Sequence, residues 1–82
     1  MGQVTVLLFA GVAERLGTRR LVVDVAPGDR VRDVRDRLTA AHPQLEPFLP
    51  SLRYAVDEEY ADEDTPVPPG ATLALIPPVS GG

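Results

Sequence analysis

One amphipathic segment, residues 30–42, limits the architectures open to this chain. Its apolar side chains recur at the spacing of an α-helix, at Val31, Val34, Leu38 and Ala41. On a helix these positions form a single stripe, and Pro43 ends the helix because proline cannot continue it. No other segment predicts a helix of comparable length, so this one is expected to cover any sheet that the chain forms.

The two ends of this segment and its polar side carry further predictions. Asp29 precedes it, and its carboxylate is expected to cap the first free N–H groups of the helix. Charged residues four positions apart on the exposed side, Arg32 with Asp36 and Asp33 with Arg37, predict ion pairs worth about 0.2–0.5 kcal/mol each.

The rest of the chain is organised in shorter segments. Runs rich in β-branched and apolar residues predict strands at 3–9, 21–25, 52–56, 59–61 and 72–76. A short helix is expected at 10–16, closed by Gly17; residues 44–50 form a proline-punctuated connection with a turn of helix at Leu45, and 62–70 form a loop. Strands before and after one long helix predict an α+β domain with a mixed sheet packed on that helix. The long connection permits parallel pairing of the first and last strands.

Length, charge and composition exclude several classes of protein. Eighty-two residues form one domain, and the absence of cysteine excludes disulfides and thiolate chemistry within these residues. The formal net charge is −4, with eight arginines and no lysine. An acidic chain without a basic patch predicts no binding to nucleic acid. No apolar run reaches 18 residues, so we expect a cytoplasmic protein that does not bind membranes.

The last six residues differ in character from the domain at 1–76. They form an expected extended tail, 77–82, made of Pro77, Pro78, Val79, Ser80, Gly81 and Gly82. The two prolines favour a stiff polyproline conformation, and six extended residues reach at most about 20 Å. Because the glycines have no side chains, a narrow channel in another protein can close around their backbone. The tip offers the α-carboxylate of Gly82.

This carboxylate needs chemical activation before it can react as an acyl group. An α-carboxyl group with a pKa of about 3.3–3.7 is ionised at neutral pH and is a poor electrophile. The chain has no phosphate-binding glycine-rich loop of the P-loop type, so ATP is expected to be used by a partner that forms an acyl-adenylate. No cofactor is predicted in this chain, and it is expected to be non-catalytic alone.

No metal site is predicted either. Acidic residues crowd positions 57–59 and 62–64, but they lack the alternation and central glycine of a calcium loop. A solvated acidic surface is the simpler interpretation. These charges could steer the chain onto a basic partner surface.

Strand alternation predicts an apolar patch on the outer face of the sheet. Period-two geometry turns Val4, Val6, Leu8, Leu73 and Leu75 toward the helix. The outward set is then also apolar and comprises Leu7, Phe9, Ala74 and Ile76. A sheet with one solvated face is normally polar there, so the pattern predicts a docking surface; the alternative is a loop of the same chain that covers it.

Three motifs together resemble one known family along the whole chain. They are Val6-Leu7-Leu8-Phe9-Ala10, Glu14-Arg15-Leu16-Gly17 and Leu75-Ile76-Pro77-Pro78-Val79-Ser80-Gly81-Gly82, and they are similar to the small, sulfur carrier subunits of molybdopterin synthases. The resemblance implies a ubiquitin-like β-grasp fold. It also implies that Phe9, Tyr60 and Ile76 contact a large catalytic subunit, in an assembly that is usually a heterotetramer.

The resemblance further implies a reaction sequence. A ubiquitin-activating-like enzyme adenylates Gly82, a sulfur donor protein converts it to a thiocarboxylate, and the tail enters the large subunit. There the sulfur passes to a cyclic pyranopterin precursor in molybdenum cofactor biosynthesis. Two departures from the family, Asp57 where Asn is common after Val56 and Ala71 where Asp follows Gly70, put the geometry of two turns in question.

Other functions share the same tail. A sulfur carrier for thiamin or cysteine biosynthesis would have the same fold and Gly-Gly end, and a ubiquitin-like protein modifier would join the activated carboxylate to lysines. A plain interaction domain with an inert tail is the remaining alternative. Phe9-Ala10 with the following short helix, and Pro77-Pro78, favour the molybdopterin type.

Overall fold

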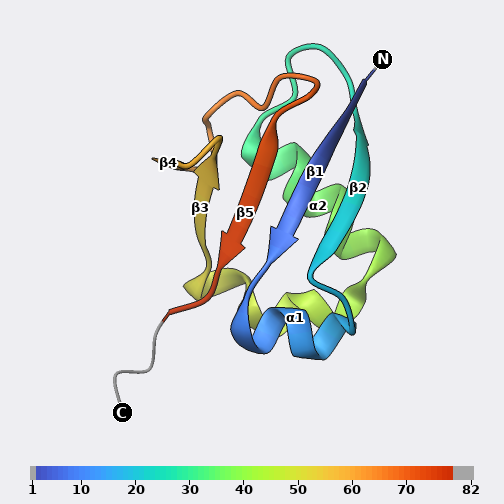
Figure 1. The fold of residues 1–82 in the computed structure, drawn as a ribbon, viewed down its shortest axis with the longest axis vertical. Helices are drawn as coiled ribbons and strands as arrows, with labels where there is room; N and C mark the ends of the chain where they lie inside the picture. Colours follow the sequence, from blue (N-terminus) through green and yellow to red (C-terminus); the bar gives the residue numbers. More distant parts are fainter. Residues whose placement is uncertain (1, 79–82) are drawn as a thin grey trace.

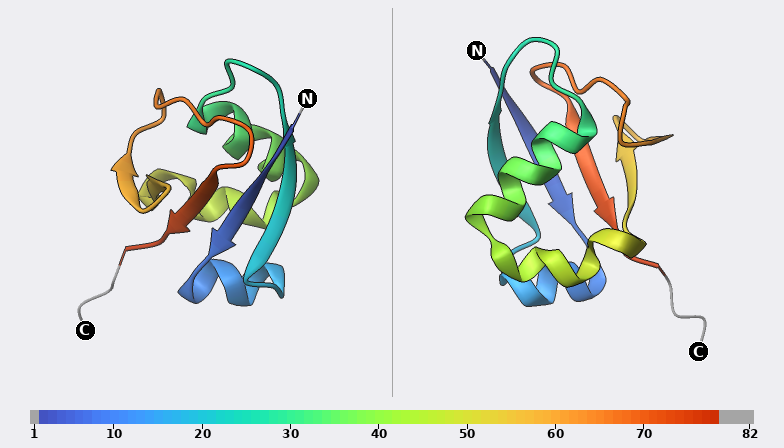
Figure 2. Two further views of the ribbon diagram at one scale, coloured as in Figure 1. Left: turned by 45° about the horizontal axis from the view of Figure 1, so that its top comes forward. Right: turned by 180° about the vertical axis from the view of Figure 1, so that it is seen from behind.

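The computed structural model describes residues 2–78. The elements follow in the order β1 (Gly2–Leu8), α1 (Ala10–Leu16), β2 (Arg20–Val25), α2 (Val31–Ala41), η1 (Pro43–Ser51), β3 (Arg53–Val56), β4 (Glu59–Ala61) and β5 (Thr72–Ile76). The five strands form one sheet in the order β2-β1-β5-β3-β4, and α2 lies across one of its faces (Figures 1 and 2). The predicted α+β class, a mixed sheet packed on one main helix, is confirmed.

Parallel pairing of the first and last strands occupies the centre of the sheet. β1 pairs in parallel with β5, in a register from Thr5 opposite Thr72 to Leu8 opposite Leu75, while all other neighbours are antiparallel. The connection through α2 and η1 carries the chain across the back of the sheet and so makes this pairing possible. As a result the C-terminal end of β5 lies at the opposite end of the sheet from Gly2, where β1 begins (Figure 1).

The core lies between the sheet and α2, as the two periodicities predict. The inward residues of the two central strands are at most 2% exposed; they are Val4, Val6, Leu8, Leu73 and Leu75. Val31, Val34 and Leu38 of α2 pack against them. Ala41, the fourth residue of the predicted stripe, is exposed at the end of the helix. Leu45 of η1 is also fully buried, which anchors a connection longer than the single helical turn expected there. Prolines 43, 47 and 50 fit this segment because their fixed φ suits a 3₁₀-helix.

The short helix α1 ends where the sequence predicts. Gly17 adopts a left-handed conformation with φ of 76°, and its N–H donates a hydrogen bond to the Ala13 carbonyl at 2.9 Å. This conformation is easy for glycine and costly for other residues. The turn directs the chain into β2, whose Leu21, Val23 and Val25 point inward.

The predicted cap at the start of α2 is wrong. Asp29 lies one residue too early, and its carboxylate instead accepts hydrogen bonds from the Ala26 N–H at 2.9 Å and the Arg37 guanidinium at 3.0 Å. Arg30 is the residue that precedes the helix. Its own N–H donates to the Asp33 carboxylate at 2.8 Å. Asp29 therefore closes the preceding turn and ties it to the helix.

The segment 62–66 takes over the capping role. Its carbonyl groups at Thr65 and Glu63 accept hydrogen bonds from the Val31 N–H at 2.9 Å and the Arg32 N–H at 3.0 Å. These are two of the free N–H groups that every helix start must satisfy. A loop some 30 residues away in the sequence therefore completes the helix.

The same segment changes the expected ion pairs. Within residues 2–78 neither predicted pair on α2 forms. Arg32 pairs with Asp64, Asp36 pairs with Arg35, and Arg37 pairs with Asp29. Arg35 also pairs with Glu63. Contact with the Tyr54 hydroxyl raises the pKa of Arg35 above its ordinary value; burial opposes this, and Glu63 and Asp36 add to it. The acidic segment 62–64 is thus exposed, as predicted, but is largely paired with arginines of its own chain.

Candidate docking site

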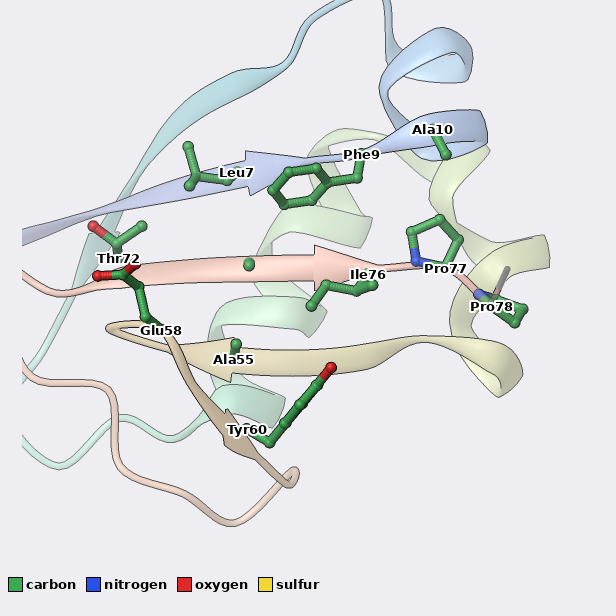
Figure 3. A pocket seen from close by; sticks show the side chains of 11 residues that line it. Leu7, Phe9, Ala10, Ala55, Glu58, Tyr60, Thr72, Ile76, Pro77 and Pro78 are labelled. Atoms are coloured by element: carbon green, nitrogen blue, oxygen red, sulfur yellow. The ribbon is translucent and has the colours of Figure 1, made fainter. Parts of the chain in front are cut away.

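The outer face of the sheet carries an apolar hollow of about 710 Å³ that runs along β5 from Thr72 to the two prolines that follow the strand (Figure 3). Its wall is formed by Leu7, Phe9, Ala10, Ala55, Glu58, Tyr60, Thr72, Ala74, Ile76, Pro77 and Pro78. Most of these side chains are apolar, which is unusual for the solvent face of a sheet. The predicted apolar patch is confirmed, and it is concave.

The register of the strands explains the concave shape. Leu7, Ala74, Ala55 and Tyr60 form one row across β1, β5, β3 and β4. The two alanines lie in the middle of this row and the large side chains at its ends. Directly opposed residues stand only about 4.5–5.5 Å apart, so small residues at the centre leave a groove along β5.

The three residues predicted to contact a partner all lie on this hollow. Phe9 follows β1, Tyr60 belongs to β4 and Ile76 ends β5, and Figure 3 shows their side chains around the same space. Phe9 is 45% exposed and Tyr60 is 83% exposed. No segment within residues 2–78 covers the hollow, which excludes the covering loop for this part of the chain. Exposed aromatic side chains around an apolar cavity are typical of protein-binding sites.

The tail begins at the rim of the hollow. Pro77 and Pro78 follow β5 directly and line its outer end (Figure 3). The remaining predicted tail residues, Val79, Ser80, Gly81 and Gly82, lie outside the described residues. A partner bound in the hollow would therefore lie next to the point where the tail starts.

Sequence reasoning missed three residues at the other end of the hollow. Ala55 could have been found from alternation in β3, because its neighbours Tyr54 and Val56 point inward. Thr72 could have been found in the same way, because it lies on the same face of β5 as Ala74 and Ile76. Glu58 could not, since only the β3–β4 turn brings it beside the start of β5. Within residues 2–78 no cluster of His, Cys, Asp and Glu side chains could hold a metal ion, and no helix there is long and apolar enough to cross a bilayer.

The β3–β4 turn is held to β5 by two hydrogen bonds. The Asp57 N–H donates to the Thr72 carbonyl at 2.9 Å, and the Thr72 N–H donates to Asp57 Oδ1 at 3.0 Å. Asp57 has a φ of 50° and Glu58 a φ of 71°. Aspartate and asparagine tolerate this left-handed region better than most residues. Aspartate at position 57, where asparagine is common in the family, therefore fits the conformation of this turn.

The arrangement of these elements defines a class of protein. A mixed five-stranded sheet with parallel central strands, one helix across its back and a tail that leaves the last strand is the ubiquitin-like β-grasp architecture. Residues 6–82 match the ThiS family, and the chain therefore belongs to that family.

Individual relatives support this assignment along nearly the whole chain. The molybdopterin synthase sulfur carrier subunit of Homo sapiens is 34% identical over 98% of this chain and 94% of the relative. The small archaeal modifier protein 1 of Haloferax volcanii is 37% identical over 92% of this chain and 95% of the relative. The resemblance to molybdopterin synthase small subunits that the motifs indicate is thereby confirmed.

Solved structures confirm the ubiquitin-like β-grasp fold. A crystal structure of SAMP1 from Haloferax volcanii has a TM-score of 0.90 and 36% identity, and the match covers 99% of this chain and 100% of that one. A ubiquitin of Caldiarchaeum subterraneum, with a TM-score of 0.66 at 22% identity, covers 99% of this chain and 98% of its own. The latter likeness concerns the fold alone.

Proposed function

We propose that this chain is the sulfur carrier subunit of a molybdopterin synthase and that Gly82 carries the sulfur as a C-terminal thiocarboxylate. The observation that carries the proposal is the apolar hollow at the base of the tail, in a chain 34% identical to a molybdopterin synthase sulfur carrier subunit. The hollow supplies a docking site for a large catalytic subunit. The tail that starts at its rim supplies the reactive group.

The chemistry begins at an ionised carboxylate. In a partner of the ubiquitin-activating type, an oxygen of the Gly82 carboxylate attacks the α-phosphate of ATP, and pyrophosphate leaves. Sulfide (HS⁻) supplied by a donor protein then attacks the carbonyl carbon of the acyl-adenylate, and AMP leaves. The product is a thiocarboxylate, because one carboxylate oxygen departs with AMP and sulfur takes its place.

Transfer occurs after docking. The large subunit binds the hollow around Phe9, Tyr60 and Ile76, and six extended residues reach up to about 20 Å from the sheet into its active site. There the thiocarboxylate sulfur attacks a carbon of the cyclic pyranopterin precursor and displaces an oxygen substituent. Water then hydrolyses the acyl–sulfur bond, which leaves the sulfur on the precursor and returns Gly82 to the carboxylate. The chain itself positions the acyl group and supplies no acid, base or metal.

Removing Gly82 tests this proposal. The truncated chain should fold with an unchanged melting temperature, because the last residues of a domain usually contribute little to its core. It should neither gain sulfur nor support conversion of the precursor by the large subunit. A variant with one alanine added after Gly82 is a matched control, since it keeps both glycines but displaces the carboxylate, and it should also be inactive.

Two readouts follow the sulfur directly. Replacement of oxygen by sulfur adds about 16 Da, and a peptide map must place this mass on the C-terminal fragment because oxidation of Met1 adds the same mass. Conversion of precursor to molybdopterin is measured with the large subunit present. If the truncated chain still supported that conversion, the tail mechanism would be wrong.

A second function has its own supporting observation. The 37% identity to a small archaeal modifier protein favours a role in which the same activated carboxylate is joined to amines of other proteins. The 82 residues contain no lysine, so such adducts would carry this chain as the donor. Peptides with a Gly82 remnant on lysines of other proteins in the native cells would establish this role, and sulfur on Gly82 without such peptides would favour the carrier alone.

A further inference from the structure

The two-residue turn between β3 and β4 places a charged side chain in a costly backbone conformation. Both central residues have positive φ, 50° at Asp57 and 71° at Glu58, as in a type I′ turn. Such turns strongly prefer glycine or asparagine. Glutamate has no preference for this left-handed backbone conformation. Residues other than glycine that are held in it lower the stability of the fold, and they concentrate at functional sites.

The local structure does not require glutamate at this position. The turn is fastened to β5 by Asp57, whose backbone and carboxylate make both hydrogen bonds to Thr72. Among the interactions of residues 2–78, no hydrogen bond or ion pair involves the Glu58 carboxylate. Figure 3 shows this carboxylate beside Thr72 at the end of the hollow opposite Pro77.

Most other charged side chains near the helix are compensated within the chain. Glu63 and Asp64 pair with arginines of α2, and Asp29 pairs with Arg37. Among residues 2–78, Glu58 is instead the one acidic side chain that lines the apolar hollow. A partner that covers the hollow must therefore remove water from this carboxylate, which is unfavourable unless a cation of the partner pairs with it.

We propose that Glu58 determines the specificity of docking by pairing with a lysine or arginine of the partner. The occupant of the hollow is then a protein surface with apolar side chains between Phe9 and Tyr60 and a cationic side chain at the β3–β4 end. The net charge of −4 favours such a basic surface. This inference rests on the proposed docking of the large subunit and names the charge that the partner must present.

Glu58→Gln tests the inference, because it removes the charge and keeps the shape and the backbone conformation. Affinity for the purified large subunit of the same organism is measured by calorimetry at about 50 and about 500 mM NaCl. We expect the dissociation constant to rise about tenfold at low salt and less than about threefold at high salt, since salt screens a partly exposed pair.

Glu59→Gln is the matched control. Glu59 has the same charge one residue further on, but it lies on the opposite side of β4 from Tyr60 and does not line the hollow. Its substitution should change the affinity by less than about twofold at either salt concentration. A loss equal to that of Glu58→Gln would attribute the effect to net charge and overturn the inference.

A second variant separates binding from stability. Glu58→Gly removes both the charge and the backbone strain, so it should bind as weakly as Glu58→Gln while its melting temperature rises by about 4–8 °C. Full affinity of Glu58→Gln at low salt would refute the pairing. If both Glu58→Gln and Tyr60→Ala kept full affinity, the assignment of the hollow as the docking site would be wrong. If Glu58→Gln kept full affinity but Tyr60→Ala bound weakly, the docking site would stand and only the proposed role of Glu58 would be refuted.

Discussion

Tyr60→Ala separates docking from folding more cleanly than any other substitution in the hollow. Tyr60 is 83% exposed, so its ring contributes little to the isolated domain and is available to a partner. Aromatic side chains at the centre of an interface often dominate its binding energy. We expect the variant to keep its fold and to lose affinity for the large subunit.

The exposed fraction sets the size of the effect. A tyrosine side chain can bury about 200 Å², so the exposed 83% leaves about 165 Å² for a partner. At about 25 cal/mol per Å², complete burial would be worth about 4 kcal/mol. Burial of half that area gives about 2 kcal/mol, or a rise of about 30-fold in the dissociation constant. The area already buried in the domain is about 35 Å², worth about 1 kcal/mol of folding stability.

The assay compares binding with folding in the same variant. Affinity for the large subunit is measured by calorimetry, and thermal unfolding of the isolated chain should shift by no more than about 4–8 °C. Val22→Ala is the matched control, because Val22 is a 56% exposed apolar residue of β2 that lies outside the hollow. Affinity of Tyr60→Ala within about twofold of wild type, or an equal loss in Val22→Ala, would refute docking at the hollow.

Two further predictions concern the stability of the domain. Leu73→Ala removes a fully buried side chain at the centre of the sheet and should lower the free energy of unfolding by about 2–5 kcal/mol, measured by urea unfolding; a loss below about 1 kcal/mol would contradict the packing described above. At Asp29, hydrogen bonds from the Ala26 N–H and Arg37 hold the carboxyl pKa below its ordinary value of 3.8. The ionised group therefore contributes stability above about pH 4 that is lost as pH falls through its folded pKa. Asp29→Asn should accordingly unfold at a lower temperature than wild type at pH 7, and this difference should disappear in acid; a difference that persists there would refute the assignment.

The predictions about the fold that proved correct were based on the spacing of residues close together in the sequence. The helical spacing of Val31, Val34 and Leu38 predicted α2 and its buried side, and alternation in β1 and β5 separated the core from the outer face. Both patterns are read from neighbouring residues, because a side chain's face depends only on the period of its own element. Phe9 and Ile76 could therefore be placed on the outer face before their neighbours were known.

Contacts between segments far apart in the sequence could not be predicted from such local patterns. Asp29 does not cap α2, Arg32 pairs with Asp64 and not with the predicted Asp36, and Arg35 pairs with Glu63 as well as with Asp36. Residues 62–66 bring Glu63 and Asp64 onto the start of α2. Glu58 reached the hollow for the same reason, through the bonds between Asp57 and Thr72.

The chain's sequence by itself thus determined its strands and the two α-helices, their buried faces and the character of its tail, since these follow from local spacing and from side-chain chemistry. The hollow, its charged end and the capping of α2 depended on the tertiary structure. Their residues come from different strands and loops, and strand register and loop packing bring them together. No local period encodes which distant residues will meet.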